Sequence, residues 1–197
     1  MVLIAGLGNP GPTYAGTRHN VGFLVAEELA ARHRAVFVAG SGAWNEARFD
    51  LGDDQVVVIK PLTFMNLSGA AVAEAREARG GTDVRLLIVY DDFQLLLGSL
   101  RLRLRGSDGG HNGMCSVIES LGTTEVPRLR CGIASPHMPI DKDQLVGFVL
   151  ERFAPDEADA VREMIRRAAD ACEAVVFRGW TAAMNEFNRP LPDVGDE

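Results

Sequence analysis

Long apolar runs and cysteines are scarce in this sequence. It has no apolar run of about 18 residues and no basic start followed by an apolar stretch. It therefore predicts neither a membrane span nor a secretory signal, and we expect a cytoplasmic protein. Cys115, Cys131 and Cys172 are widely spaced and include no C-x-x-C pair, which argues against a disulfide framework or a cysteine metal site. We expect reduced, at least partly buried thiols.

Positive charge is also scarce, since the formal net charge is −7 at pH 7. This balance excludes an all-over basic surface of the kind that binds nucleic acid. The charge is uneven, however: residues 151–197 carry an excess of acids, whereas residues 98–112 carry several arginines against Asp108 alone. A local anion site is therefore possible in the second segment.

Apolar periodicity divides the chain into alternating strands and helices. Strands are predicted at 2–5, 36–38, 44–51, 55–60, 85–91, 99–105 and 128–134, and helices at 19–33, 66–80, 111–122 and from the loop at 135–142 to about 187. This order indicates a single α/β domain over residues 1–187, with a twisted mixed β-sheet flanked by helices on both faces. Residues 188–197 have the composition of a flexible tail.

Strict alternation at 99–105 predicts a strand with leucines facing inward and arginines on the other face. The inward set is Leu100, Leu102 and Leu104, and the outward set is Arg101, Arg103 and Arg105. An outward row of arginines is typical of a surface that binds a nucleic-acid backbone, although a solvated strand face gives the same pattern.

The first strand leads into a glycine-rich stretch, GLGNPGPTYAGTRHN, whose Gly6, Gly8 and Gly11 match the dinucleotide fingerprint G-x-G-x-x-G. That fingerprint needs a helix at its third glycine and an acid at the end of the second strand. Here Pro10 and Pro12 predict a turn instead, and the second strand ends without an acid. We therefore predict no nucleotide cofactor, and expect the glycines to leave room for a ligand and water near the backbone.

Polar side chains follow several of the predicted strands: Asn9, Asn66, Asp91 and the pair His111 and Asn112, joined by His19 from the start of the first helix. Because ligand sites in open α/β sheets form outside the carboxyl ends of the strands, these groups are expected to converge. A histidine beside a carboxylate is suited to act as a general base.

The group that this base would deprotonate is best predicted as water. Ser68 and Ser107 lie in no G-x-S-x-G elbow, and Cys115 reads as a core position of its helix. Asparagine amides suit a site that holds a carbonyl group and orients a water without adding negative charge. A metal bound by His19, Asp91 and His111 stays an alternative, although no H-x-x-x-H or H-E-x-x-H spacing supports it.

Several segments of the sequence together resemble a known family. The segments GLGNPGPTYAGTRHNVGF, KPLTFMNLSG, VYDD, GSDGGHNG and RLRCGI are similar, in order and over nearly the whole chain, to the bacterial-type peptidyl-tRNA hydrolases. The resemblance implies a single α/β domain that uses no metal or cofactor and is monomeric. It also implies hydrolysis of the ester joining a peptide to the 3′ ribose of tRNA, with the acceptor end and its 3′ CCA as the part bound.

The resemblance also implies roles for individual residues. His19 would be the catalytic base and Asp91 its partner. The substrate-binding set would be Asn9, Tyr14, Met65, Asn66, His111 and Asn112. Arg103 and Arg130 would clamp a tRNA phosphate, with Arg101, Arg105 and Arg128 as neighbours.

The chain departs from the family pattern after VYDD, where FQLLLG, with Gln94 and Leu96, replaces a sequence close to DLDLPLG. The turn into the arginine strand is therefore expected to differ. Two alternatives stay open. One is a non-enzymatic relative that keeps the fold as an RNA-binding module, and the other is a hydrolase of small esters or N-acylated amino acids, for which the arginine row would be incidental.

Overall fold

The computed structural model describes residues 1–189, and only the backbone of Lys142. Its centre is a seven-stranded sheet in the order β2-β3-β4-β1-β5-β7-β6. The strands are β1 (Val2–Gly6), β2 (Val38–Ala39), β3 (Trp44–Leu51), β4 (Asp54–Pro61), β5 (Arg85–Leu96), β6 (Leu100–Arg103) and β7 (Arg128–Ala134). Strands β4, β1, β5 and β7 run parallel, whereas β2, β3 and β6 pair antiparallel with their neighbours. The predicted mixed α/β sheet is thus confirmed.

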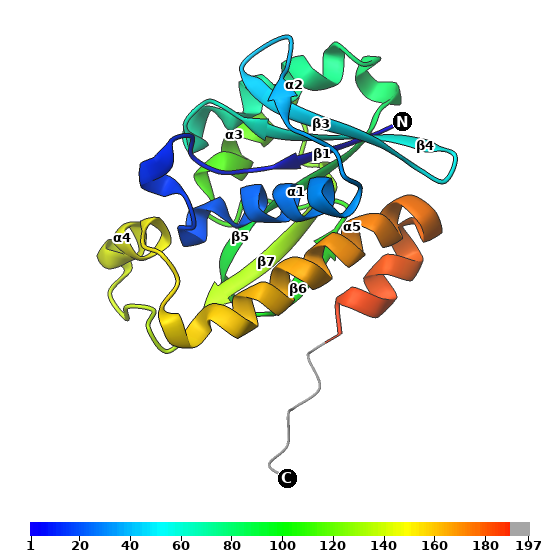
Figure 1. Ribbon diagram of the computed structural model, residues 1–197. Helices are drawn as coiled ribbons and strands as arrows, with labels where there is room; N and C mark the ends of the chain where they lie inside the picture. Colours follow the sequence, from blue (N-terminus) through cyan, green and yellow to red (C-terminus); the bar gives the residue numbers. More distant parts are fainter. Residues whose placement is uncertain (190–197) are drawn as a thin grey trace.

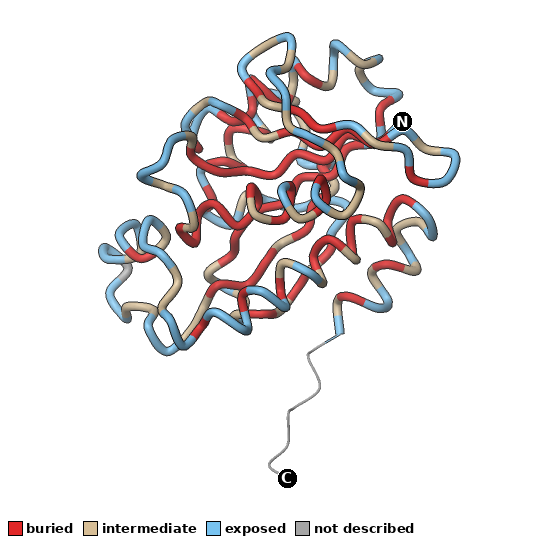
Figure 2. The backbone as a smooth tube through the Cα atoms, in the orientation of Figure 1, coloured by how far each residue is buried: buried red, intermediate tan, exposed pale blue. Residues whose placement is uncertain are grey.

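Helices cover both faces of the sheet (Figure 1). Helices α1 (Val21–Arg32) and α5 (Ala158–Phe187) pack on one face, and α2 (Ser68–Glu77) and α3 (Asn112–Leu121) pack on the other. The short helix α4 (Leu145–Leu150) lies beyond the carboxyl ends of the strands. Each face has its own apolar core, so the central strands are buried on both sides (Figure 2).

The structure corrects several predicted strand boundaries. The strand predicted at 36–38 is found instead as the two-residue β2 at Val38–Ala39, and β5 continues past Asp91 to Leu96, with an irregular register between Asp92 and Leu96. The predicted inward position of Leu104 is wrong. Strand β6 ends at Arg103, opposite the first residue of β7, so Leu104 has no strand partner and is 45% exposed.

The glycines of the first turn serve the packing of α1. A Cβ atom on Gly6 would lie 2.1 Å from the backbone oxygen of Gly22, and one on Gly8 would lie 2.7 Å from the Phe23 ring. The expectation that the glycines leave room for a ligand is therefore wrong for Gly6 and Gly8, because α1 fills that space, whereas a Cβ atom on Gly11 would meet nothing within 4 Å. Gly11, at φ 99°, does form the predicted turn.

The predicted tail at 188–197 lies largely outside the described residues. Asn188, which is described, binds the edge strand: its Oδ1 accepts from Leu102 N at 2.6 Å and its Nδ2 donates to Leu102 O at 3.2 Å. Within residues 1–189, no helix has the length and apolar character needed to cross a membrane.

Candidate active site

A cavity of about 710 Å³ opens at the carboxyl ends of β1 and β5. Every residue that the sequence places in the catalytic and substrate-binding sets lines it: Asn9, Tyr14, His19, Met65, Asn66, Asp91, His111 and Asn112. The opposite wall is apolar and comes from α4, through Leu145, Val146, Val149 and Leu150. Sequence reasoning did not identify this wall, because helical periodicity alone does not say where a short helix docks.

His19 and Asp91 meet inside this cavity. His19 lies in the 3-10 turn Arg18–Asn20 just before α1, and its Nδ1 is 2.9 Å and 3.0 Å from the two oxygens of Asp91. Asp91 is 1% exposed and His19 is 9% exposed. A proton on Nδ1 donates to the carboxylate, so the Nε2 lone pair, which has no partner among the described residues, is free to accept a proton.

His111 approaches Asp91 from the other side. It is the N-cap of α3, and its Nδ1 accepts a hydrogen bond from Met114 N at 3.1 Å. That bond requires a lone pair on Nδ1, so the proton of a neutral ring sits on Nε2 and donates to Asp91 Oδ1 at 3.0 Å. The cap therefore selects the tautomer of His111, and two imidazoles hold one carboxylate.

The protonation state of Asp91 follows from these contacts. Burial by itself raises the pKa of the carboxyl, but the imidazoles of His111 and His19 outweigh burial and hold its pKa well below the usual range. Asp91 is thus the ionised, hydrogen-bond-accepting member of the cluster. An ionised partner fixes the ring of His19 and stabilises the imidazolium that forms when Nε2 takes a proton.

The same three side chains bring one ligand atom each to within 4.8 Å of one another, close enough to hold a metal ion. The chemistry of His111 does not fit that use, because its Nδ1 lone pair is already used by Met114 N. Binding a metal through Nε2 would need a second lone pair, which a neutral imidazole lacks. The arrangement fits a proton-holding cluster better than a metal site.

The asparagine amides differ in how they are held. Asn9 is buried, and its Oδ1 accepts from Met65 N at 2.8 Å, which leaves the NH₂ group as the end able to bind a ligand. Asn66, in the 3-10 turn Met65–Leu67, and Asn112, the first residue of α3, are exposed on the rim of the cavity. Asn9 is therefore the prearranged donor of the set.

The arginines lie at the far edge of the sheet, with a second, smaller pocket of about 240 Å³. Strand register sets Arg101 opposite Arg130 and Arg103 opposite Arg128, so these four project to one face. Arg103, Arg105, Arg128 and Arg130 line the pocket together with the 106–109 loop, and Arg101 is not among its lining residues.

These arginines are not equally available to a ligand. Arg128 is 1% exposed, and its guanidinium donates to the carbonyls of Val126, Ser107 and Thr124. Arg130 is paired with Asp92, whereas Arg105 makes an exposed 3.4 Å contact with Glu125. Arg103 is exposed and contacts no carboxylate among the described residues. Arg103 thus has an exposed guanidinium that no carboxylate among the described residues pairs with, and Arg128 supports the loop.

Sequence reasoning missed buried residues beside this machinery. Arg18 is 2% exposed, forms an ion pair with Glu157 at 2.9 Å, and stacks on Phe148, so it fastens α4 to the turn that carries His19. Tyr90 packs on the His111 ring at 4.6 Å and lines the arginine pocket. The only sequence signal for Arg18 is its place in the run RHN, since its partner lies 139 residues away.

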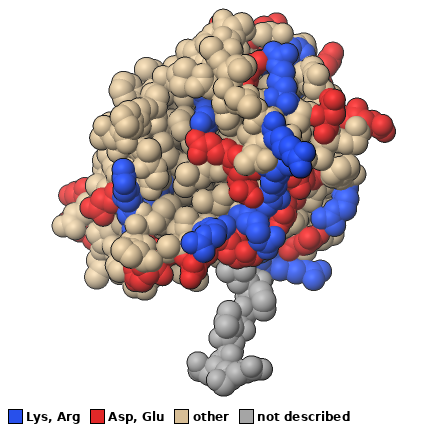
Figure 3. Space-filling view, viewed as in Figure 1, with Lys and Arg blue, Asp and Glu red and all other residues tan. Residues whose placement is uncertain are grey.

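Charge on the α1–α5 face is mixed. Figure 3 shows Lys and Arg side chains lying beside Asp and Glu side chains on this face of the molecule. The arginine pocket is built instead by β6, β7 and the loop before α3. A local anion site at residues 98–112, as the sequence suggested, is therefore compatible with the net negative charge of the whole chain.

Comparison with known proteins points to one family. The profile described as peptidyl-tRNA hydrolase matches residues 3–194. A peptidyl-tRNA hydrolase of Chloroflexus aggregans is 48% identical over 189 residues, 95% of this chain and 99% of the relative. That of Symbiobacterium thermophilum is 45% identical over 188 residues, 94% and 98% of the two chains. The crystal structure of peptidyl-tRNA hydrolase from Acinetobacter baumannii aligns with a TM-score of 0.89 at 30% identity, covering 98% and 96%.

Proposed function

The chain belongs to the peptidyl-tRNA hydrolase family, and we propose that its cavity hydrolyses the ester between a peptide, or an N-blocked aminoacyl group, and the 3′ ribose of peptidyl-tRNA. The observation that carries this proposal is the 2.9 Å contact between His19 and Asp91 inside the cavity. It supplies a base with a fixed tautomer and a free Nε2, which is what attack by water on an ester needs.

The reaction begins when His19 Nε2 takes a proton from a water molecule whose oxygen attacks the ester carbonyl carbon. The carbonyl oxygen gains negative charge, and the NH₂ group of Asn9 donates to it. When the tetrahedral intermediate collapses, the bond to the ribose 3′ oxygen breaks and that oxygen takes the proton from His19. A peptide carboxylic acid, which ionises, and a free tRNA leave, and the base is regenerated without a cofactor.

The other predicted residues hold the two ends of the substrate. Tyr14, Met65, Asn66, His111 and Asn112 line the peptide side of the cavity. Arg103 and Arg130, which line the arginine pocket, bind backbone phosphate of the acceptor arm while the single-stranded 3′ CCA reaches the cavity. Arg101, Arg105 and Arg128 are their neighbours, and the buried Arg128 acts by holding the loop. Phosphate contacts carry no sequence information, which suits an enzyme that acts as a monomer on all tRNAs in the cytoplasm and returns them to translation.

The test is turnover of N-acetyl-aminoacyl-tRNA by the wild type, His19→Ala and a control, His33→Ala. Removing the base at His19 lowers kcat by about 10³-fold, whereas His33, on the far end of α1, leaves kcat within about twofold of the wild type. Full activity in His19→Ala overturns the mechanism. A wild type that binds tRNA without turnover is instead an RNA-binding module.

The role of the tRNA body is tested by salt dependence and by Arg103→Ala. Loss of one phosphate contact weakens substrate binding and makes the slope of log K against log salt shallower by about 1. Arg162→Ala, an exposed arginine on α5, is the control and leaves the slope unchanged. If the wild type and Arg103→Ala turn over a small N-acyl ester equally well, and salt affects neither of them, the protein is a small-ester hydrolase.

A further inference from the structure

Asn20 holds Asn9 through the main chain. Its Oδ1 accepts from Asn9 N at 2.9 Å and its Nδ2 donates to Asn9 O at 2.9 Å, so one side-chain amide pairs with both polar groups of one residue. Asn20 is 3% exposed and does not line the catalytic cavity. Both ends of its amide bind Asn9, and its side chain is not among those that line that cavity.

The position of Asn9 depends on this pairing. Asn9 follows β1 in a turn that contains Pro10 and Gly11, and neighbouring strands do not bind its backbone. The backbone is held by Asn20, and the side-chain oxygen is held by Met65 N at 2.8 Å. These contacts together fix where the Asn9 NH₂ group points.

Asn20 also directly follows His19 in the same 3-10 turn, Arg18–Asn20. The base and the residue that holds the amide donor therefore belong to one rigid segment. That turn therefore contributes both the base and the side chain that holds the backbone of the amide donor.

We propose that Asn20 is a positioning residue that sets the Asn9 amide relative to the His19 base. The inference rests on the proposed function, since it assumes that Asn9 donates to the carbonyl oxygen as negative charge develops. An interaction that strengthens in the transition state affects kcat more than KM. Asn20 thus acts on the rate through Asn9 and makes no contact with substrate.

The chain offers a matched control in Asn188. Its side chain makes the same paired contact with the backbone of Leu102, at the edge strand β6 and away from the catalytic cavity. Loss of either amide removes two hydrogen bonds to one residue's backbone. A purely structural role for Asn20 predicts equal behaviour of the two sites, whereas a positioning role predicts a kinetic effect at Asn20 alone.

The experiment measures kcat and KM on N-acetyl-aminoacyl-tRNA for Asn20→Ala and Asn188→Ala, at a temperature below both melting transitions. A misplacement of about 1 Å in a catalytic group costs up to about 10²-fold, so we expect Asn20→Ala to lose about 10- to 100-fold in kcat with KM changed less than about threefold. Asn188→Ala keeps the wild-type kcat. Asn20→Asp and Asn188→Asp, which keep the size and the acceptor but lose the donor, repeat the comparison if the alanine variant does not fold.

A double-mutant cycle shows whether Asn20 acts through Asn9. In an Asn9→Ala background the donor is already absent, so Asn20→Ala costs less than about threefold more in kcat. A folded Asn20 variant with wild-type kcat overturns the inference, and so does an undiminished effect in the Asn9→Ala background. All of these outcomes require a wild type that is active on peptidyl-tRNA. An inactive wild type contradicts the proposed function itself, and this result is distinguishable from failure of the inference about Asn20.

Discussion

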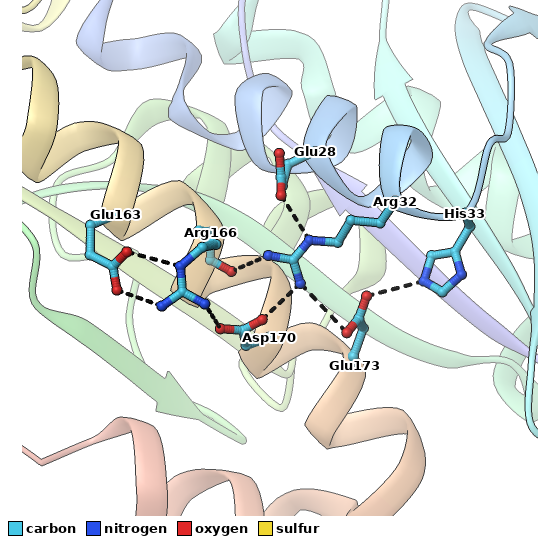
Figure 4. Close-up of polar contacts among 7 residues, drawn as sticks. All are labelled: Glu28, Arg32, His33, Glu163, Arg166, Asp170 and Glu173. Atoms are coloured by element: carbon cyan, nitrogen blue, oxygen red, sulfur yellow. Dashed lines mark hydrogen bonds and ion pairs between the residues drawn. The ribbon is translucent and has the colours of Figure 1, made fainter.

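His19 and His33 each contact a carboxylate at nearly the same distance, 2.9 Å to Asp91 and 3.0 Å to Glu173. Their surroundings differ. Asp91 is 1% exposed and shares its oxygens with a second imidazole, whereas the side chain of Glu173 is 24% exposed and also contacts Arg32 at 3.6 Å. The first pair faces a cavity, and the second belongs to a charged network between α1 and α5 (Figure 4).

The network in Figure 4 centres on Arg32, which bonds Glu28 at 2.7 Å, Asp170 at 2.7 Å and the backbone oxygen of Arg166 at 2.8 Å. A permanent cation thus compensates the carboxylates beside His33, and the imidazole itself stacks on Phe49 at 4.0 Å. At Asp91 the compensating groups are imidazoles, one of which has a free nitrogen. A short distance between a histidine and a carboxylate therefore does not by itself define a catalytic pair. What distinguishes His19 is its free Nε2, its place in a cavity and its buried, ionised partner.

The largest effect that separates the two pairs is expected from Asp91→Asn. The amide cannot stabilise the imidazolium and its NH₂ group favours the wrong tautomer of His19, so kcat on N-acetyl-aminoacyl-tRNA falls by about 10²-fold or more. Glu173→Gln makes the same chemical change at the other pair and leaves kcat within about twofold. An Asp91→Asn enzyme that keeps a third of the wild-type kcat contradicts the assignment of Asp91 as the partner of the base.

The residues of the cavity show which features of the site could be predicted from the sequence. The convergence of Asn9, Asp91 and His111 was predictable, because apolar runs identify the parallel strands and ligand sites form near their carboxyl ends. The predicted strand end at Asp91 was wrong, since β5 continues to Leu96. Motif resemblance then gave the family, which is confirmed. The roles of the individual residues stay predictions.

The contacts that shape the site were out of reach, because they join residues far apart in the chain. The pairing of Arg18 with Glu157 spans 139 residues, and no local pattern encodes it. Likewise, the arginine row is regular in sequence, but only the end of β6 at Arg103 and the carbonyls around Arg128 decide which guanidinium is accessible. Tertiary packing, rather than periodicity, makes those choices.

A smaller effect is expected at His111, where two functions can be separated. In His111→Asn the shorter side chain still caps α3 by accepting from Met114 N, because asparagine is a favourable N-cap, but it does not reach Asp91. We expect kcat to fall by about tenfold while the melting temperature stays within about 2 °C of the wild type. His33→Asn, which breaks the other histidine contact, is the control for kcat. Loss of the fold in His111→Asn, or an unchanged kcat, contradicts the separation.

The smallest effect is expected from Arg32→Ala, and it is on stability alone. The side chain is 22% exposed and binds several acceptors, so the variant loses about 1 kcal/mol in the free energy of unfolding after allowance for solvent screening. For a chain of this size the melting temperature falls by about 2–4 °C. Arg162→Ala, which breaks an isolated exposed pair with Asp159, changes it by less than about 1 °C.

Salt distinguishes the network from simple loss of packing in Arg32→Ala. At 1 M ionic strength the Debye length is about 3 Å, so the ion-pair part of the difference from wild type shrinks, whereas a difference due to the buried arginine stem does not. Because the network lies on α1 and α5 and shares no side chain with the cavity, kcat of Arg32→Ala stays at the wild-type value. A loss of kcat greater than about threefold, at a temperature where the variant is folded, means that the α1–α5 network also holds the turn that carries His19, and that the two histidine pairs are coupled through α1.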